Sequence, residues 1–468
     1  MKKKYVRWTL WTIASPFILF IILCILIYLP PIQNFLVDKA AVYASEATGM
    51  NISVGRISLS FPLNLVVTNV DAASLHNDTL LSVRRLQVNV QLLPLLKKQV
   101  EVDGISLQGA TVNSNDLIHG MKLNGTLGEL FISSHGVALD PETAIVNKVL
   151  LKDTDLSLCL NDTAAADTAA SDTTYWKIIL QDIDLQNVSF ALDMPLDSLS
   201  LAASLDNAIL RDGLIDLHKS AYSLQTFRIE NGRVRYDNGK PLAADSLSSG
   251  LDPSHIALTD IGVKLDSLYY GGRNMKAIIS QFVLKERSGV EIVSATGRMV
   301  SNDKVLRVPS LKLETRDSYL ELNAAMDWNA LDFKGEGLMS ARLMADIGKP
   351  DVVRFMGRMD EKFVRQYPSE PLRIRTGIDG DLNKLKLTTL TAELPGALGL
   401  FARGELTHLT DSLLRGGDIT LEAETKDLKF VSTLAEGIEI PYGTRLEGKF
   451  TMAGAKMGTD LLLMQPEA

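Results

Sequence analysis

Histidine, cysteine and paired carboxylates carry most protein chemistry, and their spacing in this 468-residue sequence does not favour catalysis. The six histidines are scattered, none has a partner at the spacing of a metal site, and no His-Glu-x-x-His motif occurs. We therefore predict histidines in solvated loops and no metal site. These histidines are His76, His119, His135, His218, His255 and His408.

Carboxylates recur two residues apart, as in Asp153 and Asp155 or Asp182 and Asp184. This spacing places both side chains on one wet face of a strand, which explains them without catalysis. The stretch AGAKMGT (453–459) resembles a phosphate-binding loop but lacks the required order of glycines and lysine. We predict that the chain is not an enzyme, with no catalytic residue and no cofactor.

Composition and charge exclude several classes of protein. The chain is 46% hydrophobic and 22% charged, which suits a folded protein. Its net charge of −8, with no basic stripe beyond the first residues, argues against nucleic acid as a partner. Cys24 lies in an apolar N-terminal segment, so a disulfide with Cys159 would have to form inside a membrane and is rejected. We expect Cys159 on the apolar face of a strand.

The N-terminus has the pattern of a signal anchor. Residues 1–7 carry four positive charges, and residues 8–30 form an uncharged apolar run long enough to span a bilayer. A cleaved signal peptide is disfavoured, since the run is too long and no cleavage site follows promptly. The positive-inside rule predicts a cytoplasmic N-terminus and an exported remainder. The residues that mark this segment are Trp8, Trp11 and Tyr28 near its interfaces, Pro16 and Cys24.

Residues 31–50 follow as a short amphipathic helix next to the membrane. Apolar residues recur there at helical spacing, and Gly49 is a natural stop. The helix could lie on the lipid surface or cap the first strand.

From residue 51 the dominant period is two, which is typical of strands with one apolar face. Within the stretch from Ile52 to Val70, the alternation from Ile57 to Val67 predicts a continuous apolar face about 36 Å long. The predicted face-lining residues are Ile57, Leu59, Phe61, Leu63, Leu65 and Val67, followed in the next strand by Leu86, Val88 and Val90.

Four later segments share one plan, in which a short polar or glycine turn separates two strands. They predict repeated β-hairpins, of which Asn231-Gly232 supplies the clearest turn. The whole chain would then hold about 25 to 28 strands. The segments are 102–114, 147–160, 180–192 and 224–236. Residues 339–367 and 427–438 read instead as short helices after a strand, able to plug or cap the sheet beside them.

A sheet with one apolar face must bury that face against something. A second sheet, a closed barrel or a bound ligand would each do so. We predict a mainly β fold that forms an elongated, open, taco-like β-groove. The groove would be a β-solenoid of repeated hairpins that follows one N-terminal transmembrane helix, with a few short capping helices. A closed sandwich is the alternative.

The sequence also resembles the AsmA/TamB family. The resemblance rests on Thr48-Gly49, the turn at residues 54–57, Phe61-Pro62, residues 78–81 and the break at residues 92–96, and residues 371–409 are similar to the β-repeat of the same family. It divides the chain into a cytoplasmic tail (1–7), a signal anchor (8–30), a juxtamembrane helix (31–50), an AsmA-like β region (51–160), a low-complexity loop (161–174), β-hairpin repeats (175–336), a helical insertion (337–370) and TamB-like β-repeats (371–468).

What the resemblance implies is a single-pass inner-membrane protein of a Gram-negative envelope, with its bulk in the periplasm. Its hydrophobic groove would carry phospholipids from the inner toward the outer membrane. The alternative is a scaffold for outer-membrane protein insertion or protein secretion, with an outer-membrane barrel partner of the TamA/BamA type. TamB-type chains are longer, so the resemblance also implies that this sequence is an N-terminal portion.

Overall fold

The structure is a computed structural model, and it describes residues 39, 41–42, 45–46, 50–60, 64–74, 79–91, 102–114, 120–138, 142–161, 175–239, 250–331, 337–357, 360–434, 441–454 and 456–465. The predicted signal anchor, with Trp8, Trp11, Pro16, Cys24 and Tyr28, lies outside these residues. No helix within the described part is long and apolar enough to cross a membrane. Of the predicted juxtamembrane helix, residues 39, 41–42 and 45–46 are described, and they are helical.

The described part of the chain is mainly β, as predicted, with 22 strands in a largely antiparallel sheet and few short helices. It divides into two compact units, residues 1–206 (unit 1) and 207–468 (unit 2), and the boundary falls within one strand, β8. In the described residues, segments predicted as two strands joined by a turn are single bent strands, as shown below.

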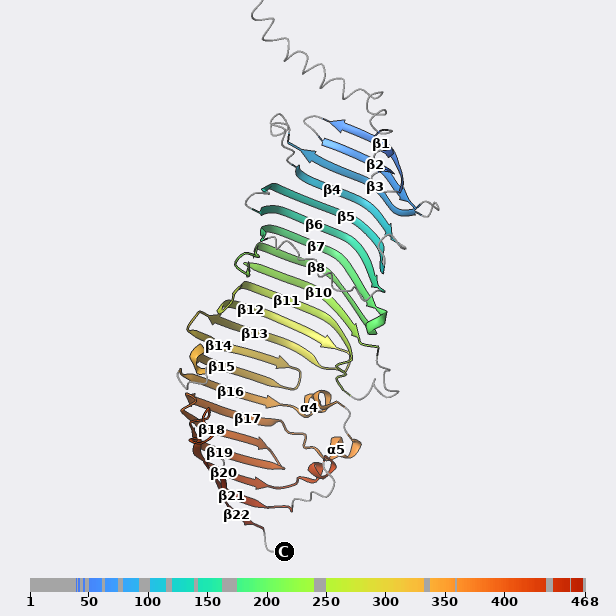
Figure 1. Cartoon of the computed structure of the whole chain (residues 1–468). Helices are drawn as coiled ribbons and strands as arrows, with labels where there is room; N and C mark the ends of the chain where they lie inside the picture. The colour runs from blue at the N-terminus through green and yellow to red at the C-terminus, as the bar shows by residue number, and fades with distance from the viewer. Residues whose placement is uncertain are drawn as a thin grey trace, which may run out of the picture. The chain divides into compact units, whose positions relative to one another are not determined.

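Unit 1 holds seven complete strands that pair in chain order (Figure 1). Neighbours pair antiparallel from β1 to β6, whereas β6 and β7 pair parallel. Residues 161–176 therefore join opposite ends of β6 and β7. The strands are β1 (Asn51–Ser60), β2 (Asn64–Ala73), β3 (Thr79–Val90), β4 (Val102–Asn113), β5 (Met121–Ala138), β6 (Thr143–Leu160) and β7 (Lys177–Met194), and a 3-10 helix η1 (Pro195–Asp197) precedes β8 (Leu199–Asp216).

Unit 2 continues with antiparallel neighbours, and β11 pairs with both β9 and β10. Its strands are β9 (Ala221–Leu224), β10 (Thr226–Asp237), β11 (His255–Gly271), β12 (Asn274–Glu286), β13 (Glu291–Ser301), β14 (Val305–Thr315), β15 (Tyr319–Asp327), β16 (Met339–Ile347), β17 (Leu372–Gly380), β18 (Lys384–Leu394), β19 (Leu398–Thr407), β20 (Gly416–Thr425), β21 (Arg445–Ala453) and β22 (Lys456–Met464).

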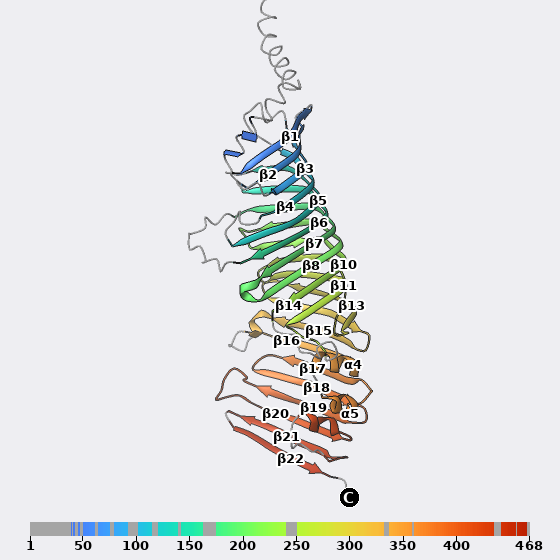
Figure 2. The ribbon, with the colours of Figure 1, turned by 90° about the vertical axis from the view of Figure 1, so that its right-hand side faces the viewer.

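Four short helices interrupt unit 2. These are η2 (Trp328–Leu331), α4 (Lys349–Met356), α5 (Glu361–Gln366) and η3 (Lys429–Thr433). Helices α4 and α5 lie beside the ends of β16 to β18 in both ribbon views (Figures 1 and 2). Residues 339–347, predicted as part of a helical segment, form strand β16.

The alternating stretch from Ile52 to Val70 is two strands, not one continuous strand. β1 ends at Ser60, β2 begins at Asn64, and the two pair antiparallel. Ile57 lies opposite Val67, and Leu59 lies opposite Leu65. The predicted face of about 36 Å is therefore folded back on itself, so its residues share one face but stack across two strands.

The predicted hairpins are also wrong, because each predicted turn lies within a single strand. Residues 102–114, 147–160, 180–192 and 224–236 fall in β4, β6, β7 and β10. At the expected turn each strand has one residue in the left-handed region, namely Gly109, Asp153, Asn187 and Asn231. A two-residue hairpin turn of type I′ needs two consecutive residues with positive φ, but Gly232 after Asn231 is not one.

In unit 1 these left-handed residues align across neighbouring strands into a bend line. Asn187 Nδ2 donates to Asp153 Oδ1 at 2.9 Å, and a Cβ placed on Gly128 would lie 2.7 Å from the Asp153 Cβ. Asn, Asp and Gly tolerate the left-handed conformation best, which explains their choice here. Strands β3 to β7 curve in Figure 1. The left-handed residues of the bend line are Asn69, Gly109, Asp153 and Asn187, and the positions between them on the neighbouring strands are Gly55, Arg84 and Gly128, which are not left-handed.

Candidate apolar binding face

Cross-strand pairing in unit 1 aligns aliphatic side chains into two uninterrupted rows. Residues directly opposite each other in a sheet share a face, so each row lies on one face. We call these 14 residues the unit 1 apolar face. The first row is Ile57, Val67, Leu86, Leu107, Leu130, Leu151 and Leu185, and the second is Leu59, Leu65, Val88, Ile105, Ile132, Val149 and Ile183.

Two more rows, mostly apolar, lie beyond the bend line. They begin at Val54 and Ile52, and they end at Val188 and Phe190. At the bend in β3 and β6, both residues of a polar pair are exposed, as at Arg84-Arg85 and Lys152-Asp153. The apolar residues that flank such a pair therefore face the other way, so the rows on both sides of the bend belong to one apolar surface.

The unit 1 apolar face has no described second layer that buries it. None of its 14 residues is fully buried, and Ile105 is exposed. Elsewhere in the described part of unit 1, the fully buried apolar residues are only Ala72, Leu80 and Val83. A contiguous aliphatic surface of this kind is characteristic of a binding site.

The predicted lining residues can now be placed. Six of them, Ile57, Leu59, Leu65, Val67, Leu86 and Val88, stand side by side in the two rows. Val90 pairs with Val102 at the end of β3. Phe61 and Leu63 lie outside the described residues.

Sequence reasoning missed most members of the rows. Leu107, Leu130, Leu151 and Leu185 extend the first row over four more strands. Their strands have the same period of two, which is the only signal that could have found them. The register that aligns them depends on the bends and loops, and periodicity alone does not encode it.

The opposite face of unit 1 is mostly polar, although one of its rows includes Val66, Phe131 and Leu150. Another of its rows is Arg56, Thr68, Arg85, Gln108, Glu129, Lys152 and Gln186. Cys159, predicted on an apolar face, lies opposite Lys122 and Asp193 instead. It alternates with Leu158 and Leu160 along β6, so it belongs to the polar face.

Unit 2 also has an apolar face, and over β16 to β21 its rows alternate large and small side chains. One row is Ala345, Ile374, Ala392, Leu400, Ala423 and Leu446, and the adjacent row is Leu343, Thr376, Leu390, Ala402, Leu421 and Gly448. Each strand thus contributes one large and one small residue. Ala345 and Ala402 are only 2% and 3% exposed, because the large neighbours fill the space above them.

An aromatic cluster covers one margin of the unit 2 face. Phe363 and Tyr367, from α5 and its C-terminal end, pack with Phe430 of η3, with ring centroids 5.1 to 5.7 Å apart. Leu394, Ala397 and Leu428 complete this buried cluster. Leu394 follows Leu390 and Ala392 at intervals of two in β18, so the cluster sits on the apolar face itself. This arrangement agrees with the prediction that short helices cap the sheet.

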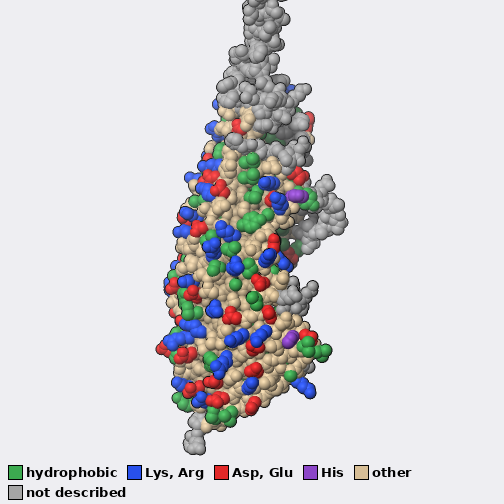
Figure 3. Space-filling view, turned by 90° about the vertical axis from the view of Figure 1, so that its left-hand side faces the viewer, with side chains coloured by type: hydrophobic (Ala, Val, Ile, Leu, Met, Phe, Trp, Pro, Cys, Tyr) green, Lys and Arg blue, Asp and Glu red, His purple; other side chains and the backbone are tan. Residues whose placement is uncertain are grey.

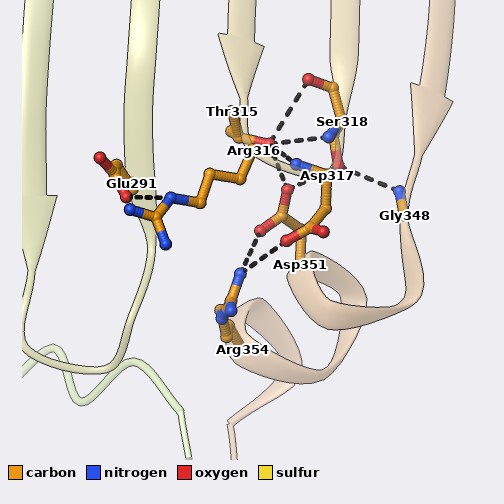
Figure 4. Close-up of polar contacts among 8 residues, drawn as sticks. All are labelled: Glu291, Thr315, Arg316, Asp317, Ser318, Gly348, Asp351 and Arg354. Carbon is orange, nitrogen blue, oxygen red and sulfur yellow. Dashed lines mark hydrogen bonds and ion pairs between the residues drawn. The ribbon is translucent and has the colours of Figure 1, made fainter.

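A buried carboxylate ties α4 to the sheet (Figure 4). Asp351 is 1% exposed and accepts hydrogen bonds from Thr315 Oγ1 and, at 2.6 Å, from Ser318 Oγ. Its other oxygen accepts from Arg354 Nη1 at 3.1 Å, and the same nitrogen contacts Asp317 at 3.0 Å. Every group in this network has a structural partner, which explains the buried charge without catalysis.

Two described histidines differ from the prediction of solvated loops: His135 lies within strand β5, and His255 is buried at the start of β11. His255 is only 5% exposed, with Nδ1 2.9 Å from Asp252 and Nε2 3.5 Å from Asp237. A backbone hydrogen bond from Ser254, together with His255, lowers the pKa of Asp252. Within the described ranges no three His, Cys, Asp or Glu side chains come together as a metal site.

Charged side chains of both signs are interspersed on the face of the molecule in Figure 3, and neither sign dominates there. In unit 2 they pair across strands on the side opposite the apolar rows, as in Arg375 with Asp346 at 2.7 Å and Lys384 with Glu405 at 3.3 Å. No family model matches this sequence, and no curated protein matches it.

Proposed function

We propose that this chain binds phospholipid acyl chains on the unit 1 apolar face and carries them between membranes. The observation that carries the proposal is the pair of uninterrupted aliphatic rows across seven strands, none of whose residues is fully buried. Aliphatic side chains without interspersed polar groups suit a flexible hydrocarbon ligand, which needs apolar contact and no hydrogen bonds.

The dimensions of the rows suit this ligand. Seven strands at about 4.8 Å spacing give each row a length of roughly 29 Å. A bilayer's hydrocarbon core is about 30 Å thick, so one acyl chain reaches about half of that. Two chains end to end, or several side by side across the strands, would therefore fit.

The setting that we propose comes from the N-terminal sequence and the resemblance to the AsmA/TamB family. Residues 8–30 would anchor the chain in the inner membrane of a Gram-negative envelope, with the bulk of the chain in the periplasm. The sheet would form an elongated open groove that carries phospholipids toward the outer membrane. The chain would act as a conduit, not as an enzyme.

The test uses the same charge on neighbouring residues of opposite faces. The full chain would be assayed for transfer of fluorescent phospholipid between vesicles, with Leu107→Glu on the apolar face and Gln108→Glu on the polar face as the matched control. We expect at least a roughly tenfold loss for Leu107→Glu, because an unpaired carboxylate is costly beside hydrocarbon. Gln108→Glu should transfer normally.

Two outcomes would contradict the proposal. Equal transfer by Leu107→Glu and Gln108→Glu would place lipid elsewhere. Absence of transfer and of bound phospholipid in the unaltered chain would favour the scaffold for outer-membrane protein insertion or secretion.

A further inference from the structure

The two margins of the unit 2 apolar face differ. At one margin the aromatic cluster of Phe363, Tyr367 and Phe430 is buried against Leu394 and Ala397. At the other margin the cross-strand row is Met339, Gly380, Leu385, Leu406, Gly417, Met452 and Met457, and none of these residues is buried. In the described part of unit 2, the face over β16 to β20 is therefore closed at one margin and open at the other.

The open margin is bordered by polar turns that also expose apolar side chains. Leu413 is 84% exposed in the turn after β19, and Met457 is 82% exposed at the start of β22. Asp381 and Asp411 accept backbone hydrogen bonds in the turns beside them. A headgroup could stay in water at this margin while its chains lie on the sheet.

The distance between the margins exceeds the hydrocarbon depth of one leaflet and is comparable to a fully extended acyl chain. From Leu385 at the open margin to Ala392 beside the cluster, β18 advances seven residues, or about 23 Å. One leaflet of a bilayer contributes about 15 Å of hydrocarbon, and an extended chain is somewhat longer. A chain lying along β17 to β19 with its headgroup at the open margin would therefore end near the aromatic rings.

We propose, on the basis of the proposed function, that the aromatic cluster is the end wall of an acyl site in unit 2. It stops the methyl end of each chain and sets the longest chain that β16 to β20 accept. Phe430 is a specificity-determining residue of this site, because its ring packs edge-on against both Phe363 and Tyr367 at the wall.

The test reads the length of the bound chain directly. The full chain would carry a photoreactive residue in place of Leu390, between the two margins, and be mixed with vesicles of phosphatidylglycerol that span short to long saturated chains. Mass spectrometry of the adduct gives the chain-length distribution. Phe430→Ala should lengthen the bound chains by roughly three carbons, the reach of the deleted ring. Phe430→Trp should shorten them.

Phe401→Ala is the matched control, since Phe401 alternates with Leu400 and Ala402 on the other face of β19. It should leave the distribution unchanged. Phe430→Ala and Phe430→Trp should shift the chain-length distribution in opposite directions if the cluster is an end wall. Unfolding would change the distribution in the same direction for both variants. An unchanged distribution in both variants, or the same shift in Phe401→Ala, would overturn the end wall.

A second probe at Leu130 separates this inference from the function on which it rests. Adducts at Leu130 without adducts at Leu390 would overturn the acyl site in unit 2 and leave the unit 1 face intact. Absence of lipid at both positions would overturn the proposed function as well.

Discussion

Units 1 and 2 both build an apolar face from strands in which apolar and polar residues alternate. The two faces differ in the sizes of the side chains that lie opposite each other on neighbouring strands. In unit 1 both rows consist of Leu, Ile and Val, and none of these residues is fully buried. Over β16 to β21 of unit 2, large residues alternate with Ala, Thr or Gly, and three of the six small ones, Ala345, Ala402 and Gly448, are buried. Residue size across neighbouring strands, and not the period along a strand, therefore sets the relief of the apolar face.

The two units also differ in whether described helices and side chains cover the apolar face. In unit 2, an aromatic cluster seals one margin, and a buried Asp351 ties α4 to the turn between β14 and β15. In unit 1 the described residues include no comparable cluster.

The largest expected difference between the two faces is the loss of folding stability when a charge is introduced. Ala402→Asp places a carboxylate at a site only 3% exposed, so we expect a loss of about 4 kcal/mol or more in the free energy of unfolding. Leu130→Asp, on the open face of unit 1, should cost far less stability and instead abolish lipid binding. Urea unfolding of both variants checks this, and equal destabilisation would show that the unit 1 face is a packed core.

Removal of the buried carboxylate should loosen the cover of unit 2. Asp351→Ala leaves Thr315 and Ser318 without their acceptor, and we expect a loss of about 2 to 3 kcal/mol. Hydrogen exchange of α4 and α5 would rise while that of β3 to β5 stays constant. Asp360→Ala, which removes an exposed N-cap of α5, is a control of smaller effect. If exchange of α4 is unaffected, the network does not hold the helix.

The bend line of unit 1 should tolerate only residues that accept a left-handed conformation. Gly109 has φ of +62°, so Gly109→Ala should cost about 1 to 2 kcal/mol. Gly399→Ala in unit 2 is the control, because its φ is not in the left-handed region and an added Cβ meets no atom within 4 Å. It should change stability by less than about 0.5 kcal/mol. Equal effects in thermal unfolding would mean that Gly109 is not required at the bend.

The smallest expected effect is a change in the pH dependence of stability, caused by Tyr367 in the aromatic cluster. Burial raises the pKa of the Tyr367 phenol, so the folded state holds this proton more tightly than the unfolded state. The resulting stability is complete below about pH 10, where an exposed phenol ionises, and is lost as the pH rises toward the folded-state pKa. Tyr367→Phe should remove part of the alkaline loss of stability in urea titrations. The same alkaline slope with and without Tyr367 would contradict this assignment.

The sequence predicted the class of fold and the apolar side of individual strands, but the turn predicted within residues 180–192 is a bend inside the single strand β7. The interval at Gln186-Asn187 interrupts the alternation between Leu185 and Val188, and Asn187 is left-handed there. Asn231-Gly232 was misread as a hairpin turn, since a single left-handed residue bends a strand without reversing it. The alternation from Ile52 to Val70 concealed the change of direction between β1 and β2, because it stays in phase in both strands.

Alignment across strands could not be predicted from periodicity. Leu130 faces Leu107 and Leu151 only because the bends set a common register. The aromatic cluster unites Phe363 with Phe430, which are distant in the sequence and come from two short helices. Such contacts depend on tertiary packing, which the local pattern does not record.

Photocrosslinking at neighbouring positions of β5 tests whether the unit 1 apolar face binds phospholipid acyl chains. A photoreactive residue would replace Leu130 on the unit 1 apolar face, and the same residue would replace Glu129 on the polar face. The full chain would be irradiated in the envelope of living cells, and the adducts would be identified by mass spectrometry. We predict phospholipid adducts at Leu130 and none at Glu129. Protein adducts alone, or equal lipid labelling at both positions, would contradict the claim that the unit 1 apolar face holds acyl chains.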